Sequence, residues 1–386
     1  MKMKKNKIVF LVLHLGCGGA ERAVISEANL LSAHYPVEIL SAYQMGPVPA
    51  FPVDAKVKVT YLQENLRPNK EELRKSIASK NPISIVREIC RSLRILYLRT
   101  HLMKKAVRNS DGHIFISSRY LYHRLLTKHA PKGAVCIAQE HNHHNNDERY
   151  IRKQVKAVAK MDYFMPVSAE LAAFYKTRVR PSVSCVYIPH HLEVIPETVS
   201  PLTGKGIISV GRFSPEKGMD ELIRVYQGIA KDHPDWALHL VGDGEQRALL
   251  EQQAAETGLG DQIHFHGFCT QEQIRNLMQE MSIYVMTSHT EAFGLVLIEA
   301  QAMGLPCVAY DSARGAGEIL RSEENGILIA ARNRGKMVEA IGKMIEDEDH
   351  RRQIGQNGRA SVLVYSKENV EKKWVALIQS CGGTAV

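Results

Sequence analysis

Two glutamates, Glu291 and Glu299, stand eight positions apart in the stretch TEAFGLVLIEAQAMGLPCVAYD. The preceding residues IYVMTSHT predict a strand, and AFGLVLIEAQAMG predicts a helix that begins near Phe293. The amides of Phe293, Gly294 and Leu295 would then have no partner inside the helix. Because a carboxylate accepts hydrogen bonds from two neighbouring hydroxyls, the pattern favours a ligand with hydroxyl-rich rings, such as a sugar and a ribose, with one carboxylate for each ring.

Two cations precede this stretch in VGRFSPEKG, where Arg212 follows a predicted strand and Lys217 stands at the start of the next helix. Arginine offers a planar fork of donors and lysine a compact charge, so together they suit a diphosphate. Two solvated surface cations are the alternative. Gly242 in LVGDG and Phe268 in FHGF end further predicted strands, and each is a weaker signal for backbone groups facing the same ligand.

The first turn of the chain, LHLGCGGAERAV, places Gly16, Gly18 and Gly19 between a predicted strand and a helix. Glycines let the backbone approach a ligand, and the free amides of a helix start favour an anion. The spacing differs from the dinucleotide motif G-x-G-x-x-G because Glu21 occupies the third glycine position, which weakens the case for a Rossmann oxidoreductase. A tight turn without a ligand is the alternative.

A histidine-rich loop, EHNHHNND, follows a predicted strand in the first half. His141, His143, His144 and Asp147 invite a metal-site interpretation, but their spacing is not that of an ordinary zinc site. A polar loop beside a ligand site is therefore favoured, and no metal site is predicted.

Short apolar strands alternate with amphipathic helices in both halves of the chain, which predicts α/β architecture with two doubly wound parallel-sheet domains that face each other across a cleft. An N-terminal domain of residues 1–190, a proline-containing linker of residues 191–203 and a C-terminal domain of residues 204–365 are predicted. Strands are predicted at 7–14, 37–42, 57–61, 113–117, 134–138, 163–167, 184–188, 206–210, 237–241, 263–265, 282–287, 306–310 and 327–329. Helices are predicted at 19–33, 84–108, 118–129, 148–160, 168–177, 217–231, 244–257, 271–279, 293–303, 334–347, 349–361 and 367–379. Ligands of such folds bind at the carboxyl ends of the strands.

Composition and charge limit the classes of partner that the protein is expected to bind. The chain has 386 residues, 45% of them hydrophobic, seven scattered cysteines without a C-x-x-C pair, and a formal net charge of +9. Residues 1–200 carry 31 Lys and Arg against 16 Asp and Glu, whereas residues 201–386 carry 19 against 25. The basic first half indicates an anionic partner such as a membrane surface, phosphates or nucleic acid. Nucleic acid is disfavoured because aromatic residues make up only 6% and do not alternate with the positive charges.

The stretch ISIVREICRSLRILYLRTHLMKKAVRN predicts a long helix with unequal sides. Apolar side chains gather on one side, at Ile85, Ile89, Leu93, Leu96, Met103 and Val107. Arg87, Arg91, Arg94 and Lys105 fall opposite. The helix either docks on its own domain and leaves a basic side in water, or it meets an anionic membrane or a lipid pyrophosphate.

The order of GGAER, VGRFSPEKG, VGDG, the Glu-x7-Glu pattern and ENGIL resembles family 4 retaining glycosyltransferases of the GT-B fold. The resemblance implies that Glu299 holds the nucleotide ribose, Glu291 the donor sugar, and Arg212 and Lys217 the diphosphate. The Phe293–Leu295 amides help, and Gly18 and Gly19 face the phosphates from the other domain. A histidine close to the reacting sugar is also implied; His141 in EHN is the match, and His143 and His144 are the competing positions. The last helix, 366–380, is expected to return to the first domain.

The first half contains the GGAER turn, a basic predicted helix before HIFIS, and the EHN loop. In these features it is also similar to N-acetylgalactosamine transferases that extend undecaprenyl-pyrophosphate-linked oligosaccharides. The resemblance implies a peripheral enzyme at the cytoplasmic face of the membrane. It would move a hexose or N-acetylhexosamine from a nucleotide diphosphate sugar, with UDP favoured, to a lipid-linked or polysaccharide acceptor without a required cofactor. Another GT-B chemistry, such as that of an epimerase or a phosphorylase, and a basic binding protein without activity are the alternatives.

Overall fold

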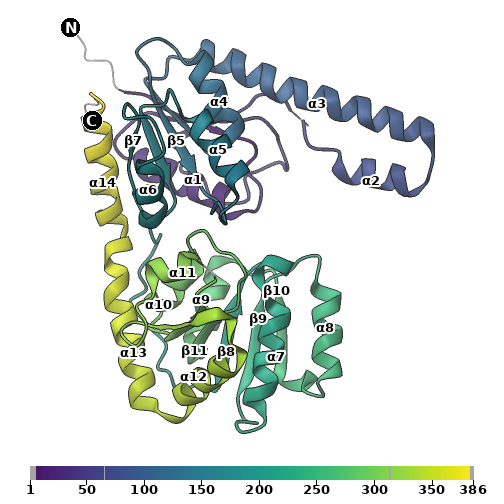
Figure 1. Ribbon diagram of the computed structural model, residues 1–386, viewed down its shortest axis with the longest axis vertical. Helices are drawn as coiled ribbons and strands as arrows, with labels where there is room; N and C mark the ends of the chain where they lie inside the picture. The colour runs from purple at the N-terminus through teal and green to yellow at the C-terminus, as the bar shows by residue number, and fades with distance from the viewer. Residues whose placement is uncertain (1–5, 65, 313, 383–386) are drawn as a thin grey trace. The chain divides into compact units, whose positions relative to one another are not determined.

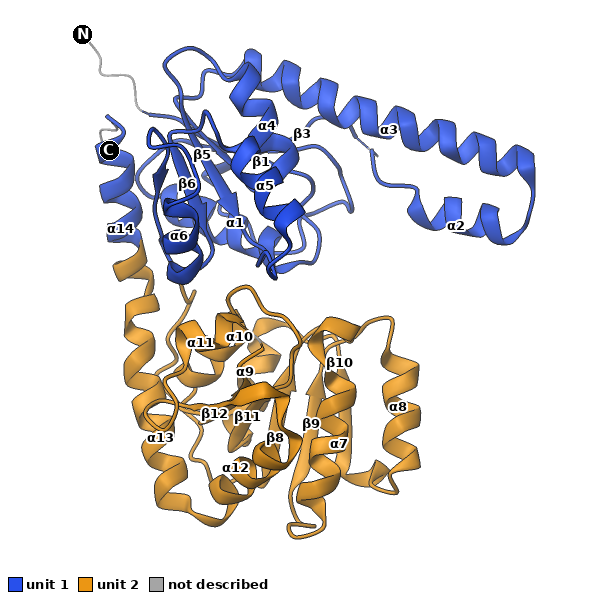
Figure 2. Ribbon diagram, in the orientation of Figure 1, with its two compact units in different colours: residues 1–190, 371–386 blue, residues 191–370 orange. Residues whose placement is uncertain are grey.

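The computed structural model describes residues 6–64, 66–312 and 314–382. They form two compact units (Figure 2). Unit 1 contains the described residues up to His190 and those from Glu371 onward, and unit 2 runs from His191 to Val370. Residues 191–203, predicted as the linker, lie in unit 2 and form hydrogen bonds with other residues of that unit. The Leu192 amide donates to the Tyr365 carbonyl and the Ser200 amide to the Met303 carbonyl, both at 2.9 Å.

Unit 1 is built on a seven-stranded parallel sheet of order β3-β2-β1-β4-β5-β6-β7 (Figure 1). The strands are β1 (Ile8–Val12), β2 (Val37–Ser41), β3 (Val57–Tyr61), β4 (Ile114–Ser117), β5 (Val135–Glu140), β6 (Tyr163–Pro166) and β7 (Ser184–Cys185). Every residue of β1, IVFLV, is buried, because helices cover both faces of a parallel sheet. The order reverses between β1 and β4, which makes that point the expected ligand position of this unit.

Helices follow most of these strands, and three of the six, α3, α5 and α6, begin at a side-chain cap. They are α1 (Gly19–Leu31), α2 (Lys70–Ala78), α3 (Pro82–Arg108), α4 (Tyr120–His129), α5 (Glu148–Ala157) and α6 (Ala169–Lys176). The Asn81 side chain accepts hydrogen bonds from the amides of Ile83 and Ser84, and Pro82 stands at the first helical position of α3. Helix α14 (Lys367–Ser380) begins in unit 2, but its residues from Glu371 onward belong to unit 1.

Unit 2 repeats the plan with a six-stranded parallel sheet of order β10-β9-β8-β11-β12-β13. The strands are β8 (Gly206–Val210), β9 (Ala237–Val241), β10 (Ile263–Gly267), β11 (Ile283–Met286), β12 (Cys307–Tyr310) and β13 (Ile327–Ile329). The helices are α7 (Met219–Ala230), α8 (Arg247–Glu256), α9 (Gln271–Glu280), α10 (Leu295–Ala302), α11 (Arg314–Ile319), α12 (Arg334–Glu346) and α13 (Glu348–Ser361), with short 3-10 turns at Pro215–Lys217, Gly260–Gln262, Ala330–Arg332 and Val362–Tyr365. The order reverses between β8 and β11.

The predicted fold class is confirmed in its two doubly wound parallel sheets, and every predicted strand is present. Helices α2 and α11 were not predicted. Helix α10 begins at Leu295, two residues later than predicted, because Gly294 takes a left-handed conformation with φ 96° and caps the helix. The arrangement of the two domains across a cleft stays a prediction.

Candidate active site

The loop after β8 brings Lys217 close to the end of β11. Pro215–Lys217 forms a 3-10 turn, and Gly218 leaves it with φ 62° to start α7. A Cβ at Gly218 would lie 2.4 Å from the carbonyl oxygen of Thr287, so only glycine lets the two loops approach this closely. Thr287 Oγ1 also donates a hydrogen bond of 2.8 Å to the Gly218 carbonyl. The loop after β8 is therefore held against the residues that follow β11.

Lys217 and Glu291 form an ion pair across the point where the strand order of unit 2 reverses. Lys217 Nζ lies 2.5 Å from Glu291 Oε2, and the two side chains are 25% and 18% exposed. The structure thus brings together two of the predicted site residues from separate strand ends. Each provides a neutralising partner for the other and remains open to solvent on one side.

Arg212 stands on the same loop, directly after β8, with its side chain 69% exposed. Its Nη2 atom lies 3.0 Å from Glu216 Oε1, a surface pair of the kind that contributes little to stability. The guanidinium can therefore exchange this partner for an anion at small cost.

Glu299 lies in α10, on the segment that follows the Glu291 loop. Both carboxylates act on Tyr284, a fully buried residue of β11. Burial is the main cause that raises the pKa of Tyr284 far above its ordinary value, and Cys307, Glu291 and Glu299 raise it further. The two glutamates are therefore electrostatic neighbours of one strand, β11, in agreement with a shared ligand.

The start of α10 differs from the prediction. Leu295 is its first residue, whereas Phe293 belongs to the preceding turn and buries its ring 5.8 Å from that of Tyr365. The Gly294 carbonyl accepts a hydrogen bond of 2.8 Å from the Leu297 amide. The inclusion of the Phe293 amide in the helix start was therefore wrong, and Gly294 is the cap.

Gly242 and Phe268 occupy the ends of β9 and β10. Gly242 has φ 140°, and a Cβ there would lie 1.9 Å from the Gly211 carbonyl oxygen, so this glycine allows the turns after β8 and β9 to pack together. The Phe268 side chain is 75% exposed. Gly242 shapes the loop that carries Arg212, and the role predicted for the Phe268 backbone stays a prediction.

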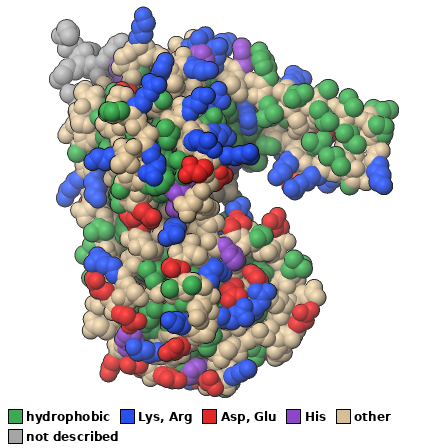
Figure 3. All heavy atoms as spheres, in the orientation of Figure 1, with side chains coloured by type: hydrophobic (Ala, Val, Ile, Leu, Met, Phe, Trp, Pro, Cys, Tyr) green, Lys and Arg blue, Asp and Glu red, His purple; other side chains and the backbone are tan. Residues whose placement is uncertain are grey.

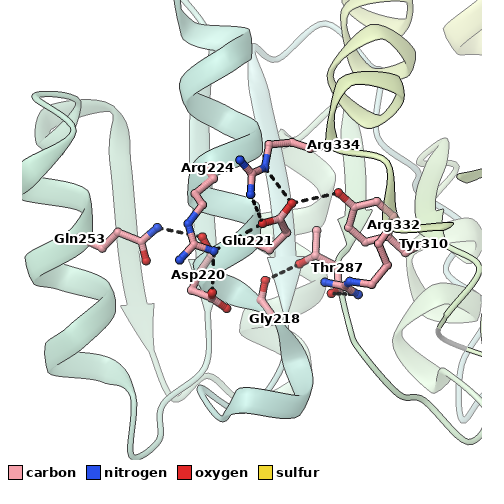
Figure 4. A network of polar contacts seen from close by, with 9 residues as sticks. All are labelled: Gly218, Asp220, Glu221, Arg224, Gln253, Thr287, Tyr310, Arg332 and Arg334. Atoms are coloured by element: carbon pink, nitrogen blue, oxygen red, sulfur yellow. Dashed lines mark hydrogen bonds and ion pairs between the residues drawn. The ribbon is translucent and has the colours of Figure 1, made fainter. Parts of the chain in front are cut away.

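Arg332 supports the same region, and sequence reasoning missed it. Its Nη1 atom donates to the carbonyls of Thr287 and Ser288, both at 3.0 Å, and to Ser312 Oγ at 3.1 Å. Its guanidinium lies 4.5 Å from the centre of the Tyr310 ring (Figure 4). The sequence gives no signal for this role of Arg332. Its backbone is left-handed, with φ 51°, and its partners are backbone carbonyls, and neither feature can be read from residue types.

A second network in Figure 4 joins α7 to the residues after β13. Arg334 Nε and Nη2 donate to the two carboxylate oxygens of Glu221 at 2.9 and 2.7 Å, and Tyr310 Oη donates to Glu221 at 3.2 Å. Burial opposes ionisation of Glu221, but the hydrogen bond from Arg334 and its charge lower the pKa of this carboxyl overall. The network fixes α7, the helix that starts at the Lys217–Gly218 turn.

In unit 1, Gly18 and Gly19 stand at the start of α1, beside the reversal point between β1 and β4. Gly18 caps the helix in an extended conformation, and a Cβ there would lie 2.2 Å from Glu21 Oε2. Glu21 Oε1 accepts a hydrogen bond of 2.6 Å from Arg119 Nη2, which comes from the residues after β4. A Cβ at Gly19 would meet no atom within 4 Å, so sterics alone do not require glycine there.

His141 follows β5 and lies parallel to His190, with ring centres 5.8 Å apart. Its Nε2 atom is shielded from solvent and has no hydrogen-bond partner among the described residues. Burial, and then the neighbouring His190, lower the pKa of His141 to about 4. The imidazole is therefore neutral near neutral pH and offers one free nitrogen.

The other polar residues of this loop point to different partners. His143 Nδ1 pairs with Asn145 Oδ1 at 2.9 Å, whereas the buried His144 ring packs 4.3 Å from that of Phe174. Asp147 caps α5 by accepting hydrogen bonds from the amides of Arg149 and Tyr150. Within the described part of the chain, no group of three or more His, Cys, Asp or Glu residues is arranged to hold a metal ion.

Comparisons with known proteins agree with this geometry. Residues 193–361 match the sequence model of the family "Glycosyl transferases group 1". The match covers less than half of the chain and supports a group 1 glycosyltransferase domain in this part of it. The match includes both loops of the Lys217–Glu291 pair and most of unit 2.

Relatives of the group 1 domain extend the similarity over more of the chain. An exopolysaccharide phosphotransferase of Streptomyces coelicolor is 27% identical over 93% of this chain but only 39% of its own length. An uncharacterized glycosyltransferase of Haemophilus influenzae is 28% identical over 97% of this chain and 100% of its own. The family match and the names of such relatives indicate a transferase enzyme.

Solved structures share the fold. The sucrose-phosphate synthase of Thermosynechococcus elongatus superposes with a TM-score of 0.77 at 19% identity, over 97% of this chain and 99% of that one. Anabaena HepE, solved in complex with UDP, superposes with a TM-score of 0.73 at 19% identity, over 97% and 100% of the two chains. A group 1 domain therefore stands here within a GT-B architecture.

Proposed function

We propose that the chain transfers a hexose or N-acetylhexosamine from a UDP-sugar to a lipid-linked oligosaccharide or polysaccharide precursor at the cytoplasmic face of the membrane, with retention of anomeric configuration. The observation that carries the proposal is the Lys217–Glu291 pair, held at 2.5 Å where the strand order of the group 1 domain reverses. Such a position is where doubly wound sheets bind nucleotides.

The donor's diphosphate is proposed to lie against Lys217 and Arg212. Negative charge grows on this leaving group as the glycosidic bond breaks, so cations that meet it there stabilise the transition state more than the ground state. Binding separates Lys217 from Glu291, and the released carboxylate then accepts hydrogen bonds from the sugar hydroxyls. Glu299 is proposed to accept those of the ribose.

His141 is proposed to contact the reacting sugar through its unpaired Nε2. A neutral imidazole donates or accepts a hydrogen bond without adding positive charge beside a sugar that becomes cation-like. No carboxylate is assigned as a nucleophile. The acceptor's proton passes to the leaving phosphate in a displacement on one face of the sugar, which accounts for retention.

The acceptor class is supported by relatives rather than by contacts. One relative is named as a lipopolysaccharide core biosynthesis glycosyltransferase of Rhizobium meliloti, and another as a poly(ribitol-phosphate) α-N-acetylglucosaminyltransferase of Staphylococcus aureus. The two names describe sugar transfer in the synthesis of a lipopolysaccharide core and sugar transfer to poly(ribitol phosphate). Because Arg212 and Lys217 carry the charge opposite the diphosphate, we propose that no metal cofactor is required.

A transfer assay tests the proposal. Radiolabelled UDP-sugars are incubated with the chain and a membrane extract, and new glycosidic linkages are identified in the lipid and polysaccharide fractions. Glu299→Ala should bind UDP more weakly than wild type and lose transfer. Interconversion of free UDP-sugars without transfer would instead support an epimerase. Phosphate-dependent cleavage would support a phosphorylase, and binding without turnover would support a protein that only recognises its ligand.

A further inference from the structure

Helices α2 and α3 form a hairpin that extends from the rest of unit 1 (Figure 1). Helix α3 enters the core from Ile95, which is 7% exposed, to Met103 and Val107, which are both fully buried, and it packs against α4. We call residues 70–98 the α2–α3 arm. Of the two predicted possibilities, docking on its own domain therefore holds for the C-terminal part of α3, while the first part of the helix extends away from the sheet.

One side of α3 in the arm carries large apolar side chains in water. The apolar stripe consists of Ile83, Val86, Ile89, Leu93, Leu96 and Tyr97, which are 44–81% exposed. At 100° and 1.5 Å per residue, these side chains cover an arc of about 140° and a length of about 21 Å. Figure 3 shows hydrophobic side chains gathered over this arm, with Lys and Arg side chains at its margin.

The opposite side of α3 is fixed to the segment before α2 by buried polar contacts. Asn69 Nδ2 donates to the Glu88 carbonyl and to Glu88 Oε2, both at 2.9 Å, and Ser92 Oγ donates to Asn69 Oδ1 at 2.8 Å. Because these contacts set the rotation of α3, the apolar stripe cannot turn inward without breaking them. The stripe is a preformed surface.

A row of arginines borders the apolar stripe. Arg87, Arg91 and Arg94 follow its edge on the helix, and α3 contains seven Lys and Arg residues but a single acidic residue, Glu88. Glu88 is buried, with Arg87 Nε at 3.3 Å and Arg91 Nη1 at 3.6 Å from its oxygens. Because one carboxylate faces three arginines, the accessible side of the arm combines apolar side chains with an excess of positive charge.

We propose that the α2–α3 arm lies in the surface of an anionic lipid bilayer, with the apolar stripe among the acyl chains and the Arg87–Arg91–Arg94 row on the lipid phosphates. Helices with such a division of sides lie in the plane of the interface. A second copy of the chain is a poorer occupant, because it would bring two arginine rows together. Nucleic acid would engage the arginines and leave the stripe in water.

This inference rests on the proposed function only for its biological meaning, which is delivery of the active site to a lipid-linked acceptor. No helix in the described residues has the length and apolar character needed to cross a membrane. Attachment by the arm is interfacial, and it extends the sequence prediction that this helix meets an anionic membrane by naming the side chains that enter the lipid.

The test is co-sedimentation of the full chain with vesicles of phosphatidylglycerol and phosphatidylcholine. Wild type should bind, and Ile89→Asn/Leu93→Asn should reduce partitioning by at least about tenfold, since two large apolar side chains no longer enter the lipid. The matched control, Leu249→Asn/Leu363→Asn, changes two comparably exposed leucines of unit 2 and should bind as wild type does. Arg87→Gln/Arg91→Gln/Arg94→Gln should abolish the preference for phosphatidylglycerol over pure phosphatidylcholine vesicles.

Equal vesicle binding by wild type and Ile89→Asn/Leu93→Asn would overturn the inference. So would loss of a wild-type dimer in that variant, which assigns the stripe to a second copy, or displacement of the vesicles by nucleic acid. UDP binding by calorimetry separates the two proposals, because the stripe variant should retain it. Vesicle binding without UDP binding would refute the proposed function alone, and UDP binding without vesicle binding would refute the arm.

Discussion

At the scale of single residues, Lys217 and Glu291 are expected to respond in opposite ways to substitution. Lys217→Met removes a cation from the proposed diphosphate site, so UDP should bind about 10- to 100-fold more weakly, the usual worth of a hydrogen bond to a charged group. Glu291→Gln removes the carboxylate that holds Lys217 at 2.5 Å, so UDP, which has no donor sugar, should bind equally well or more tightly. Sugar transfer should fall in both variants.

Calorimetric titration of UDP into the two variants measures this difference, with Lys217→Arg as the control that keeps the charge. If Glu291→Gln weakens UDP as strongly as Lys217→Met, the ion pair does not compete with the ligand, and the proposed exchange of partners is wrong.

His123 predicts a pH dependence of stability. It is fully buried in α4, with Nδ1 2.7 Å from Ser117 Oγ, and burial lowers its pKa from 6.5 to about 3. Between pH 6.5 and about pH 3, His123 is therefore protonated in the unfolded chain but neutral in the folded chain. As a result, the contribution of His123 to the free energy of unfolding falls as the pH decreases below 6.5. The slope approaches about 1.4 kcal/mol per pH unit.

Urea unfolding of wild type and His123→Gln between pH 7 and pH 4 isolates this contribution, because all other titrating groups are shared. The variant should be less stable at pH 7 but lose less stability on acidification. Parallel curves for the two proteins would show that His123 does not titrate as burial requires.

At the scale of elements, the loop after β8 predicts the effect of a single methyl group. Gly218→Ala combines a left-handed backbone, φ 62°, with a Cβ only 2.4 Å from the Thr287 carbonyl. Gly258→Ala is the matched control, because Gly258 has φ 73° but no atom within 4 Å of its Cβ position. Gly258→Ala should cost about 1–2 kcal/mol of unfolding free energy, and Gly218→Ala a further 1–3 kcal/mol.

Chemical denaturation of the two variants gives both values, and UDP affinity adds a second readout. Gly218→Ala should also weaken UDP binding, since the displaced loop carries Lys217. Equal stabilities of the two variants would mean that the approach of Gly218 to Thr287 is looser than described.

Some of the helices and strands could be predicted from the sequence and others could not. Buried parallel strands are continuous apolar runs, such as IVFLV in β1, so both sheets could be predicted. Helix α2 has no buried residue and α11 is a six-residue RGAGEI, so neither shows an apolar periodicity. The left-handed backbone of Gly294 makes α10 begin at Leu295, and the apolar sequence around it does not predict this conformation.

The site was predictable by residue type but not by contact. Glu291 and Lys217 could each be assigned to strand ends, whereas their pairing depends on a register between loops 74 positions apart. Arg332 could not be found, because its partners are backbone carbonyls that any sequence supplies. For α3, the periodicity of the sequence shows that the helix has an apolar side but not what covers that side. A helix that docks on its domain and a helix with an exposed apolar stripe have the same sequence pattern.

At the scale of the whole molecule, helix α14 is divided between the two units. Its first residues, up to Val370, belong to unit 2, whereas Trp374 and Ile378 are fully buried in the part that belongs to unit 1. His34 Nε2 lies 2.7 Å from Glu371 Oε1, which ties the end of α1 to this helix. The folding of unit 1 therefore depends on residues that follow unit 2 in the chain.

Trp374→Ala should accordingly lower the stability of unit 1, although residue 374 follows unit 2 in sequence. Truncating a buried tryptophan costs about 3–5 kcal/mol. Hydrogen exchange should accelerate in α1 and in β6, whose Tyr163 lies beside Ser380, and stay unchanged in the sheet of unit 2. Glu371→Gln, which only weakens a part-exposed ion pair, should cost less than about 1 kcal/mol and change exchange little. Faster exchange in unit 2 on Trp374→Ala would show that α14 stabilises the second unit instead, and would place the boundary between the units after the helix rather than within it.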